Sequence, residues 1–185
     1  MACSDIDSHI ITACKKKDKA AQKALYEHYA SYVYGICLRY AKNSQDAEDL
    51  MQDAFIKILK NIKRYKDYGS FTGWLTRIAV NTAISFYRKK ARHMTSPDSE
   101  AVGKEADEPF FVDAHIFAKD IIEAIKELPD GYRLVFNLYA IEGYDHNEIS
   151  EMLDIAASSS RSQYFRARKM LQRALEHTYK ELQTE

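Results

Sequence analysis

The chain has 185 residues, of which 46% are hydrophobic and 29% charged, which fits one folded domain or two small ones. No apolar run approaches the roughly 20 residues of a membrane helix, the start lacks a signal-peptide pattern, and the three cysteines form no CxxC pair. These features predict a cytoplasmic protein with reduced thiols. The net charge of zero divides into +8 for residues 1–93, −11 for 94–157 and +3 for 158–185, which favours contact of the basic parts with a polyanion.

Helical periodicity dominates the first half of the chain. Apolar residues recur at spacings of three and four over residues 18–41 and again from Ala47 to Ile62, where Asn43 or Ser44 is expected to cap the helix. A further helix is predicted from about Phe71 to Arg92. Its inward-facing residues are predicted to be Phe71, Trp74, Leu75, Ile78 and Phe86.

Residues 94–114 are polar and acidic and contain two of the three prolines, so they are predicted to form a linker. A second helical group follows, with helices predicted at residues 116–128, 132–141, 148–153 and 158–182. The predicted fold class is therefore all-α, with two small helical domains at residues 1–93 and 115–185 joined by the acidic linker.

The second group contains the spacing of a helix-turn-helix. Asp145 and Glu148 form a capping-box pattern, and Asp154 stands where such motifs usually place a glycine in a left-handed turn. Ser158 or Ser159 is expected to cap the next helix. The side chains predicted for its outer surface, which suit phosphates and base edges in a major groove, are Ser158, Ser159, Ser160, Arg161, Gln163, Arg166, Arg168 and Lys169. An amphipathic hairpin that packs on its own domain is the alternative.

Two further surfaces are unusual. Residues 64–90 mix aromatic rings with arginines and lysines, a combination that suits both the stacking of flat apolar groups and the neutralisation of anions. On the helix predicted at residues 44–64, a stripe of polar and acidic side chains interrupted by one isoleucine lies opposite the apolar stripe. A solvated face would explain the charges, whereas an interface also explains the isoleucine.

Together these segments resemble the extracytoplasmic-function (ECF) sigma factors of bacterial RNA polymerase, compact members of the sigma-70 superfamily. The matching segments are DAEDLMQDAFIKILKNI, GSFTGWLTRIAVNTAISFYRKK, and LPDGYRLVFNLYAIEGYDHNEISEMLDI followed by SRSQYFRARKML. The chain departs from the family pattern at Ser85, Asp154 and Ser160, where aspartate, glycine and valine are more usual.

The resemblance implies a role for each segment. Residues 1–93 would be sigma region 2 and residues 115–185 sigma region 4, which recognises the −35 element through the outer side chains of the helix-turn-helix. The residues that would bind core polymerase are Asp49, Gln52, Asp53, Ile56 and Lys60. The residues that would contact the melted −10 element are Tyr65, Lys66, Asp67, Tyr68, Trp74, Arg77, Asn81, Ile84, Arg88 and Lys89.

The resemblance also implies the partners. These are core RNA polymerase, through the coiled coil of its largest subunit and its flap, promoter DNA, and, as often in the family, an anti-sigma factor. No membrane insertion, catalysed reaction, cofactor or metal is expected. Two other interpretations are a helix-turn-helix regulator that binds duplex DNA without polymerase, and a helical enzyme or scaffold that uses carboxylates such as Asp46, Asp49 and Asp53.

Overall fold

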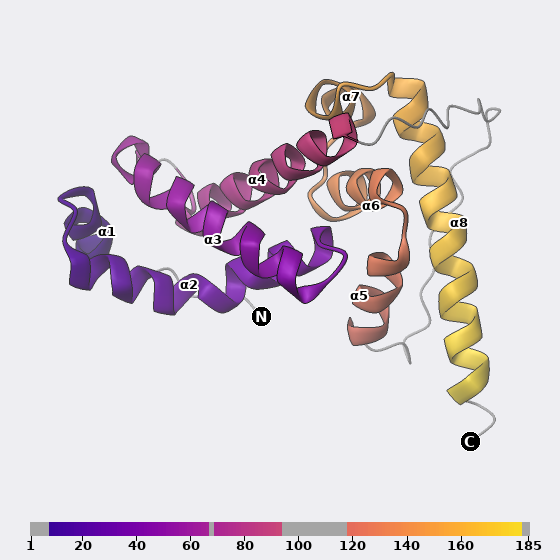
Figure 1. Ribbon diagram of the computed structural model, residues 1–185, viewed down its shortest axis with the longest axis horizontal. Helices are drawn as coiled ribbons and strands as arrows, with labels where there is room; N and C mark the ends of the chain where they lie inside the picture. The colour runs from indigo at the N-terminus through magenta and orange to yellow at the C-terminus, as the bar shows by residue number, and fades with distance from the viewer. Residues whose placement is uncertain (1–7, 67–68, 94–117, 183–185) are drawn as a thin grey trace. The chain divides into compact units, whose positions relative to one another are not determined.

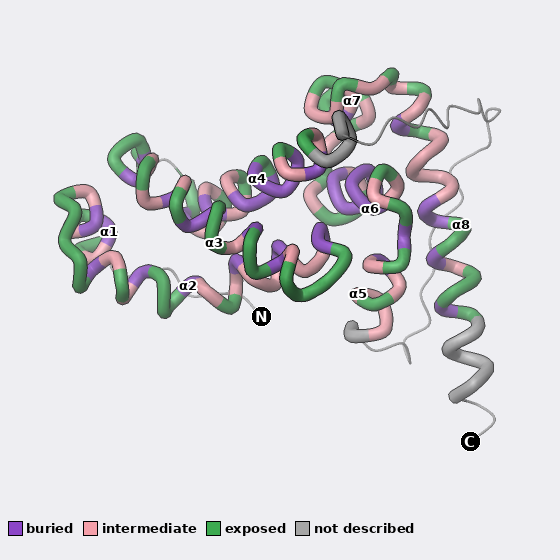
Figure 2. The backbone as a smooth tube through the Cα atoms, viewed as in Figure 1, coloured by how far each residue is buried: buried purple, intermediate pink, exposed green. Residues whose placement is uncertain are grey.

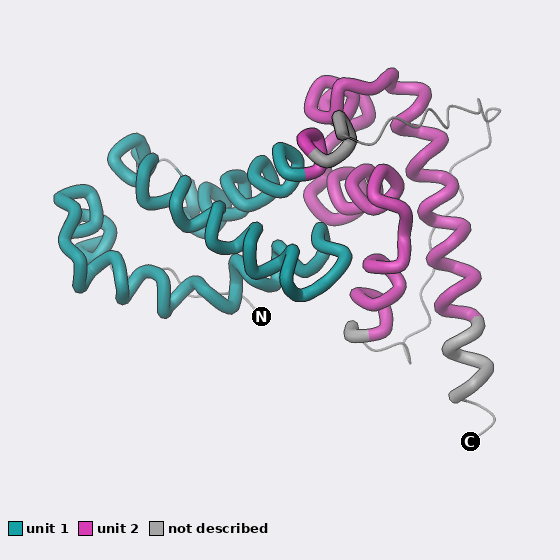
Figure 3. Tube along the Cα trace, viewed as in Figure 1, with its two compact units in different colours: residues 1–86 teal, residues 87–185 magenta. Residues whose placement is uncertain are grey.

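The computed structural model describes residues 8–66, 69–93 and 118–182, and every regular element in these ranges is helical (Figure 1). The chain divides into two compact units, Met1–Phe86 and Tyr87–Glu185 (Figure 3). The all-α class with two domains is thereby confirmed. The linker predicted at residues 94–114 lies outside the described residues, so its boundaries stay a prediction.

The described residues of the first unit form four α-helices and a short 3-10 turn. These are α1 (Ser8–Lys15), α2 (Lys19–Tyr40), α3 (Ser44–Asn61), η1 (Ile62–Arg64) and α4 (Phe71–His93), the last of which continues into the second unit. Local sequence explains where the helices begin. Asp18 caps α2 by accepting a hydrogen bond from the backbone N–H of Ala21 at 2.8 Å. Asn43 accepts one from Asp46 N–H at 2.7 Å and caps α3, as predicted.

The core of the first unit follows the apolar stripes expected from the sequence. Buried positions recur along α2 and α3 (Figure 2), with Leu25, Tyr29 and Val33 facing the core from α2. Leu50 and Ile58 are fully buried on α3. Burial at this spacing removes apolar area from water along the whole contact, which is the main stabilisation of such helices.

Both cysteines in the described part of the chain are buried free thiols, Cys14 on α1 and Cys37 on α2. Burial raises the pKa of Cys14, and it raises the pKa of Cys37 to about 12. Because the thiolate is the reactive form, both thiols are chemically quiet at neutral pH and act as small apolar core residues.

Within residues 118–182, the second unit packs five helical elements around its own core. They are α5 (Ala118–Glu127), α6 (Asp130–Phe136), the π-helical turn η2 (Asn137–Ile141), α7 (His146–Leu153) and α8 (Ala157–Leu182). The single helix predicted at residues 132–141 is therefore split, with α6 ending in a π turn. The core cluster consists of Ile125, Leu128, Phe136, Ala167 and Leu171.

Arg133 is the largest fully buried side chain among the described residues of this unit. Its guanidinium donates to the backbone carbonyls of Lys126 at 3.0 Å and Leu128 at 2.8 Å, and it is paired with Asp130. A buried cation is tolerated when its donors are satisfied in this way. These contacts of Arg133 join the end of α5 to the start of α6 and fix the turn between them.

Candidate functional site

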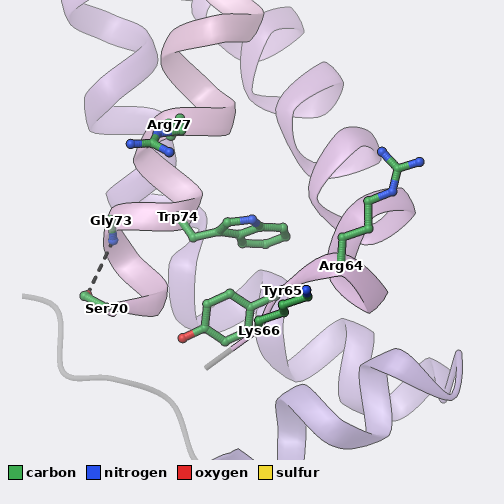
Figure 4. Close-up of a pocket in the computed structure, with 7 residues that line it drawn as sticks. All are labelled: Arg64, Tyr65, Lys66, Ser70, Gly73, Trp74 and Arg77. Carbon is green, nitrogen blue, oxygen red and sulfur yellow. Dashed lines mark hydrogen bonds between the residues drawn. The ribbon is translucent and has the colours of Figure 1, made fainter. Parts of the chain in front are cut away.

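A pocket opens in the first unit where η1 ends and α4 begins. Its volume is about 410 Å³. The lining residues are Arg64, Tyr65, Lys66, Ser70, Gly73, Trp74 and Arg77. Figure 4 shows the indole of Trp74 and the ring of Tyr65 one above the other in the pocket, with Arg64 and Arg77 on opposite sides. The pocket therefore combines flat apolar walls with cations at its rim.

The turn before α4 positions this pocket. Gly69 has a φ of 92°, a value that suits glycine, and Ser70 Oγ accepts a hydrogen bond from Gly73 N–H at 3.4 Å at the start of the helix (Figure 4). One turn later the helix presents Trp74 to the pocket. The tryptophan is half-buried, so one part of the ring packs and another remains open.

Tyr65 is part of the wall rather than an exposed loop residue. Only 6% of it is accessible, its ring lies 4.9 Å from Phe71 and 5.4 Å from Trp74, and its hydroxyl donates to the Gly69 carbonyl at 3.0 Å. Lys66 is exposed beside it. Asp67 and Tyr68, which the family resemblance implies would contact the melted −10 element together with Tyr65, lie outside the described residues. Phe71 is buried, as the sequence predicted.

The outward stripe predicted along α4 is correct in part. Arg77, Asn81 and Lys89 are exposed and Arg88 is half-exposed. Ile84 is only 5% accessible, so its predicted outward orientation is wrong. The physical reason is its helical position, four residues after buried Val80 and three before buried Tyr87. Ile84 therefore contributes to packing and leaves the set of DNA-contacting candidates.

The outer face of α3 is exposed as predicted at all five positions, Asp49, Gln52, Asp53, Ile56 and Lys60. Ile56 is the clearest sign of an interface, because 49% of this branched apolar side chain is accessible. We call these five residues the α3 face. Their role in polymerase binding stays a prediction.

A groove adjoins the α3 face and was not anticipated from the sequence. It has a volume of about 520 Å³ and is lined by Tyr26, Ala30, Ser31, Tyr34, Glu48, Met51 and Gln52. Tyr26 is 41% accessible and its ring lies 4.7 Å from that of Phe55. A signal for Tyr26 was present in the sequence, since it is an aromatic residue next to Leu25 and outside the apolar stripe of α2.

In the second unit, α7 and α8 form the predicted helix-turn-helix. The capping box is complete: Asp145 accepts from Glu148 N–H at 2.9 Å, and Glu148 accepts from Asp145 N–H at 2.8 Å. Asp154 ends α7 in the left-handed conformation with a φ of 58°, as expected at the position where glycine is more usual.

The start of α8 differs from the prediction. The helix begins at Ala157, and the backbone N–H of Ser160 already bonds to the carbonyl of Ala156, so Ser158 and Ser159 lie inside the helix and do not cap it. Ser158, Arg161 and Lys169 are exposed.

Other predicted contacts of α8 are less accessible. Ser159, Gln163 and Arg166 are half-exposed, and Arg166 donates to the hydroxyl of Tyr132 at 3.1 Å. Ser160 and Arg168 are buried at 0% and 6% accessibility, so their predicted outward orientation is wrong.

Helical spacing and one hydrogen bond explain these two corrections. Position 160 lies four residues before Tyr164, and position 168 lies four after it and three before buried Leu171, so both fall on the packed stripe. The hydroxyl of Ser160 is 2.9 Å from Nδ1 of His146 on α7, and the His146 ring stacks on Tyr139 with centroids 4.4 Å apart. A polar residue is accepted here because α7 supplies its partner.

Two absences hold for the described part of the chain. In residues 8–66, 69–93 and 118–182, His, Cys, Asp and Glu side chains form no group of three able to hold a metal ion. No helix in these ranges combines the length and apolar character that crossing a bilayer requires.

Comparison with known proteins gives two family matches. Sigma-70 region 2 matches residues 25–93, and Sigma-70, region 4 matches residues 118–171. The chain is 32% identical over 177 residues to the ECF RNA polymerase sigma factor SigW of Bacillus subtilis, covering 89% of this chain and 94% of the relative. It is 28% identical over 196 residues to the RNA polymerase sigma-H factor of Pseudomonas aeruginosa, covering 98% and 100%.

A solved structure shares the fold. The sigma factor RpoE of Bartonella quintana, crystallised with the anti-sigma factor NepR, is similar with a TM-score of 0.50 at 22% identity, covering 83% of this chain and 96% of that chain. Two helical units that carry regions 2 and 4 define a transcription initiation factor of the sigma-70 type, a class that is not enzymatic. Within that class, the chain belongs to the ECF sigma factors.

Proposed function

We propose that this protein binds core RNA polymerase, directs it to promoters and holds the melted −10 element in the pocket lined by Tyr65 and Trp74. The observation that carries the proposal is the composition of that pocket, an aromatic wall with Arg64, Lys66 and Arg77 at its rim. A base that leaves the duplex loses its stacking partners, and an aromatic ring replaces them at roughly 1–3 kcal/mol per base. The cations neutralise the phosphates on either side.

The α3 face and the groove beside it are the proposed docking surface for the polymerase. Acidic Asp49 and Asp53 suit a basic partner helix, and exposed Ile56 supplies an apolar contact at the centre. Tyr26 and Tyr34 add aromatic groups of the kind that dominate protein interfaces. We assign this surface to the coiled coil of the largest subunit and assign residues 115–185 to the flap.

The exposed residues of α8 are proposed to read the −35 element. Arg161 has the reach and the donors for base edges in the major groove, while Ser158 and Lys169 suit phosphate oxygens. We retain the domain division 1–93, 94–114 and 115–185 for these roles. The protein is proposed to act in the cytoplasm, where an anti-sigma factor would restrain it by covering its polymerase-binding surfaces.

Reconstituted transcription tests this function. Core polymerase is incubated with a fragmented genomic library, with and without the protein, and the transcripts are sequenced. Transcripts that share an upstream motif and require the protein are expected. If the same start sites are used with core polymerase alone, the proposal is wrong. A pull-down with core polymerase separates it from a regulator that acts on duplex DNA alone, which would not co-purify stoichiometrically.

A further inference from the structure

A turn rich in lysine lies beside the pocket and is not used by the function proposed above. Four of the five residues from 15 to 19 are lysines, and we call Lys15, Lys16, Lys17 and Lys19 the lysine turn. It connects α1 to α2. Lys16, Lys17 and Lys19 are exposed, whereas Lys15 is half-buried.

A contact of Lys15 places this turn next to the pocket. The ammonium of Lys15 lies 5.6 Å from the ring centroid of Tyr65, whose ring forms part of the pocket wall. The remaining lysines of the turn follow directly in the chain. The lysine turn therefore adjoins one wall of the pocket, although none of its lysines lines the pocket itself.

The backbone of the turn is less favourable for lysine than for glycine at one position. Lys17 has a φ of 65°, a left-handed conformation that glycine adopts freely and that is unfavourable for other residues. It occupies the place after α1 where helices commonly have glycine, with its N–H bonded to the Cys14 carbonyl at 2.9 Å. A neutral glycine would suit this backbone better than lysine does.

The lysines of the turn are also not paired with carboxylates in the described part of the chain, and Asp18 lowers the net charge of residues 15–19 only from +4 to +3. Over the described ranges, none of the four lysines forms an ion pair with a carboxylate. The carboxylate of Asp18, in the middle of the turn, accepts the capping hydrogen bond from Ala21 N–H instead. The ammonium groups of Lys16, Lys17 and Lys19 thus remain available to an anion.

We propose that the lysine turn binds the phosphodiester backbone of the single DNA strand whose base occupies the pocket. Lysine suits this role because its ammonium contacts phosphate as a point charge and carries no base preference. The turn would add affinity and salt dependence to the bound strand without changing which sequence is chosen. The inference rests on the proposed function, because it requires a melted strand in the neighbouring pocket.

The test compares two variants of equal charge change in holoenzyme reconstituted with core polymerase. Lys16→Gln/Lys17→Gln alters the turn, and Lys23→Gln/Lys42→Gln removes two exposed lysines elsewhere in the first unit. The probe is promoter DNA with a pre-opened −10 bubble, and its affinity is measured by fluorescence anisotropy at several salt concentrations. Each lost phosphate contact lowers the log–log salt slope by about 0.7 for a single strand, which is about fivefold in affinity at 0.1 M salt.

We expect the turn variant to bind about 25-fold more weakly at 0.1 M salt, with a slope smaller by about 1.4, and the control variant to match the wild type. Equal slopes for turn variant and wild type would overturn the inference. So would equal losses in both variants, which indicate a general effect of charge, or a loss of core polymerase binding by the turn variant. If the wild-type holoenzyme itself ignores the bubble, the proposed function fails instead.

A single substitution separates charge from folding. Lys17→Gly is expected to raise the thermal midpoint, because glycine relieves the left-handed backbone, and to weaken bubble binding about fivefold. A stability gain with unchanged DNA affinity would exclude Lys17 from the phosphate contact. A lysine that is only solvent-exposed and contacts no DNA would not give a higher thermal midpoint together with weaker bubble binding.

Discussion

Replacing Trp74 with alanine tests the pocket most sharply. The indole packs on Phe71 with ring centroids 5.5 Å apart and planes inclined by 25°, and on Tyr65 at 5.4 Å. Its open part faces the pocket (Figure 4). The substitution therefore removes a stacking surface for DNA and two aromatic contacts within the fold.

The two losses have different sizes. A base stacked on an aromatic ring gains roughly 1–3 kcal/mol, so the dissociation constant for a −10 bubble is expected to rise about 5- to 150-fold. Each aromatic pair contributes about 0.5–1.5 kcal/mol beyond its buried area, so the first unit is expected to lose at least about 1–3 kcal/mol of stability, to which the lost burial of the packed part of the indole is added. That loss leaves a domain of ordinary stability, about 5–15 kcal/mol, folded.

The assay uses a matched control on the other surface of the same unit. Tyr26→Ala also removes a half-exposed aromatic ring with one ring neighbour, Phe55, but it lies in the groove beside the α3 face. Trp74→Ala should bind core polymerase normally and the bubble weakly. Tyr26→Ala should bind core polymerase weakly, and at saturating polymerase concentration it should bind the bubble normally. Trp74→Phe, which keeps a ring, should fall between Trp74→Ala and the wild type. Normal bubble binding by folded Trp74→Ala would refute the reasoning.

Three further predictions concern the other surfaces. Asp53→Lys reverses an exposed charge on α3, so core polymerase binding is expected to weaken by at least about 2 kcal/mol with an unchanged thermal midpoint; normal affinity in a pull-down would contradict it. Arg161→Ala should weaken binding to a duplex −35 element by about 1–3 kcal/mol while leaving a bubble probe without that element unaffected, and equal loss on both probes would argue against the division of roles. Asp145→Ala removes the side-chain cap of α7 and should lower stability by about 1–2 kcal/mol in urea unfolding, a result that an unchanged midpoint would exclude.

Local sequence patterns predicted several helix ends, but they missed α1, placed the cap of α8 at Ser158 or Ser159 and joined α6 and η2 into one helix. The capping box at Asp145 and Glu148, the cap at Asn43 and the left-handed residue Asp154 each depend on neighbours within a few positions. Interactions between residues this close in the sequence can be predicted from the sequence alone. The same is true of the α3 face, because this helix has one clear buried stripe and helical spacing places the five residues opposite it.

The prediction of side-chain orientation from the sequence failed where two helix faces were both packed, or where a polar group had a partner far away in the sequence. Ile84 fits an outward stripe with Arg77 and Asn81 as well as an inward one with Val80 and Tyr87, and spacing alone does not choose between them. Ser160 has the polarity of a surface residue, but it is buried because its hydroxyl bonds to His146, fourteen positions earlier in the sequence. The Lys15 contact with Tyr65 likewise joins residues fifty positions apart.

Photo-crosslinking tests the central claim, that the pocket holds an unstacked promoter base, most directly. Holoenzyme is bound to a promoter whose non-template strand carries one photoreactive base at a time through the −10 element, and the crosslinked peptides are mapped. The account predicts that one position crosslinks within residues 64–77, and that this crosslink is lost in Trp74→Ala. Crosslinks confined to other parts of the chain, or unaffected by the substitution, would contradict it.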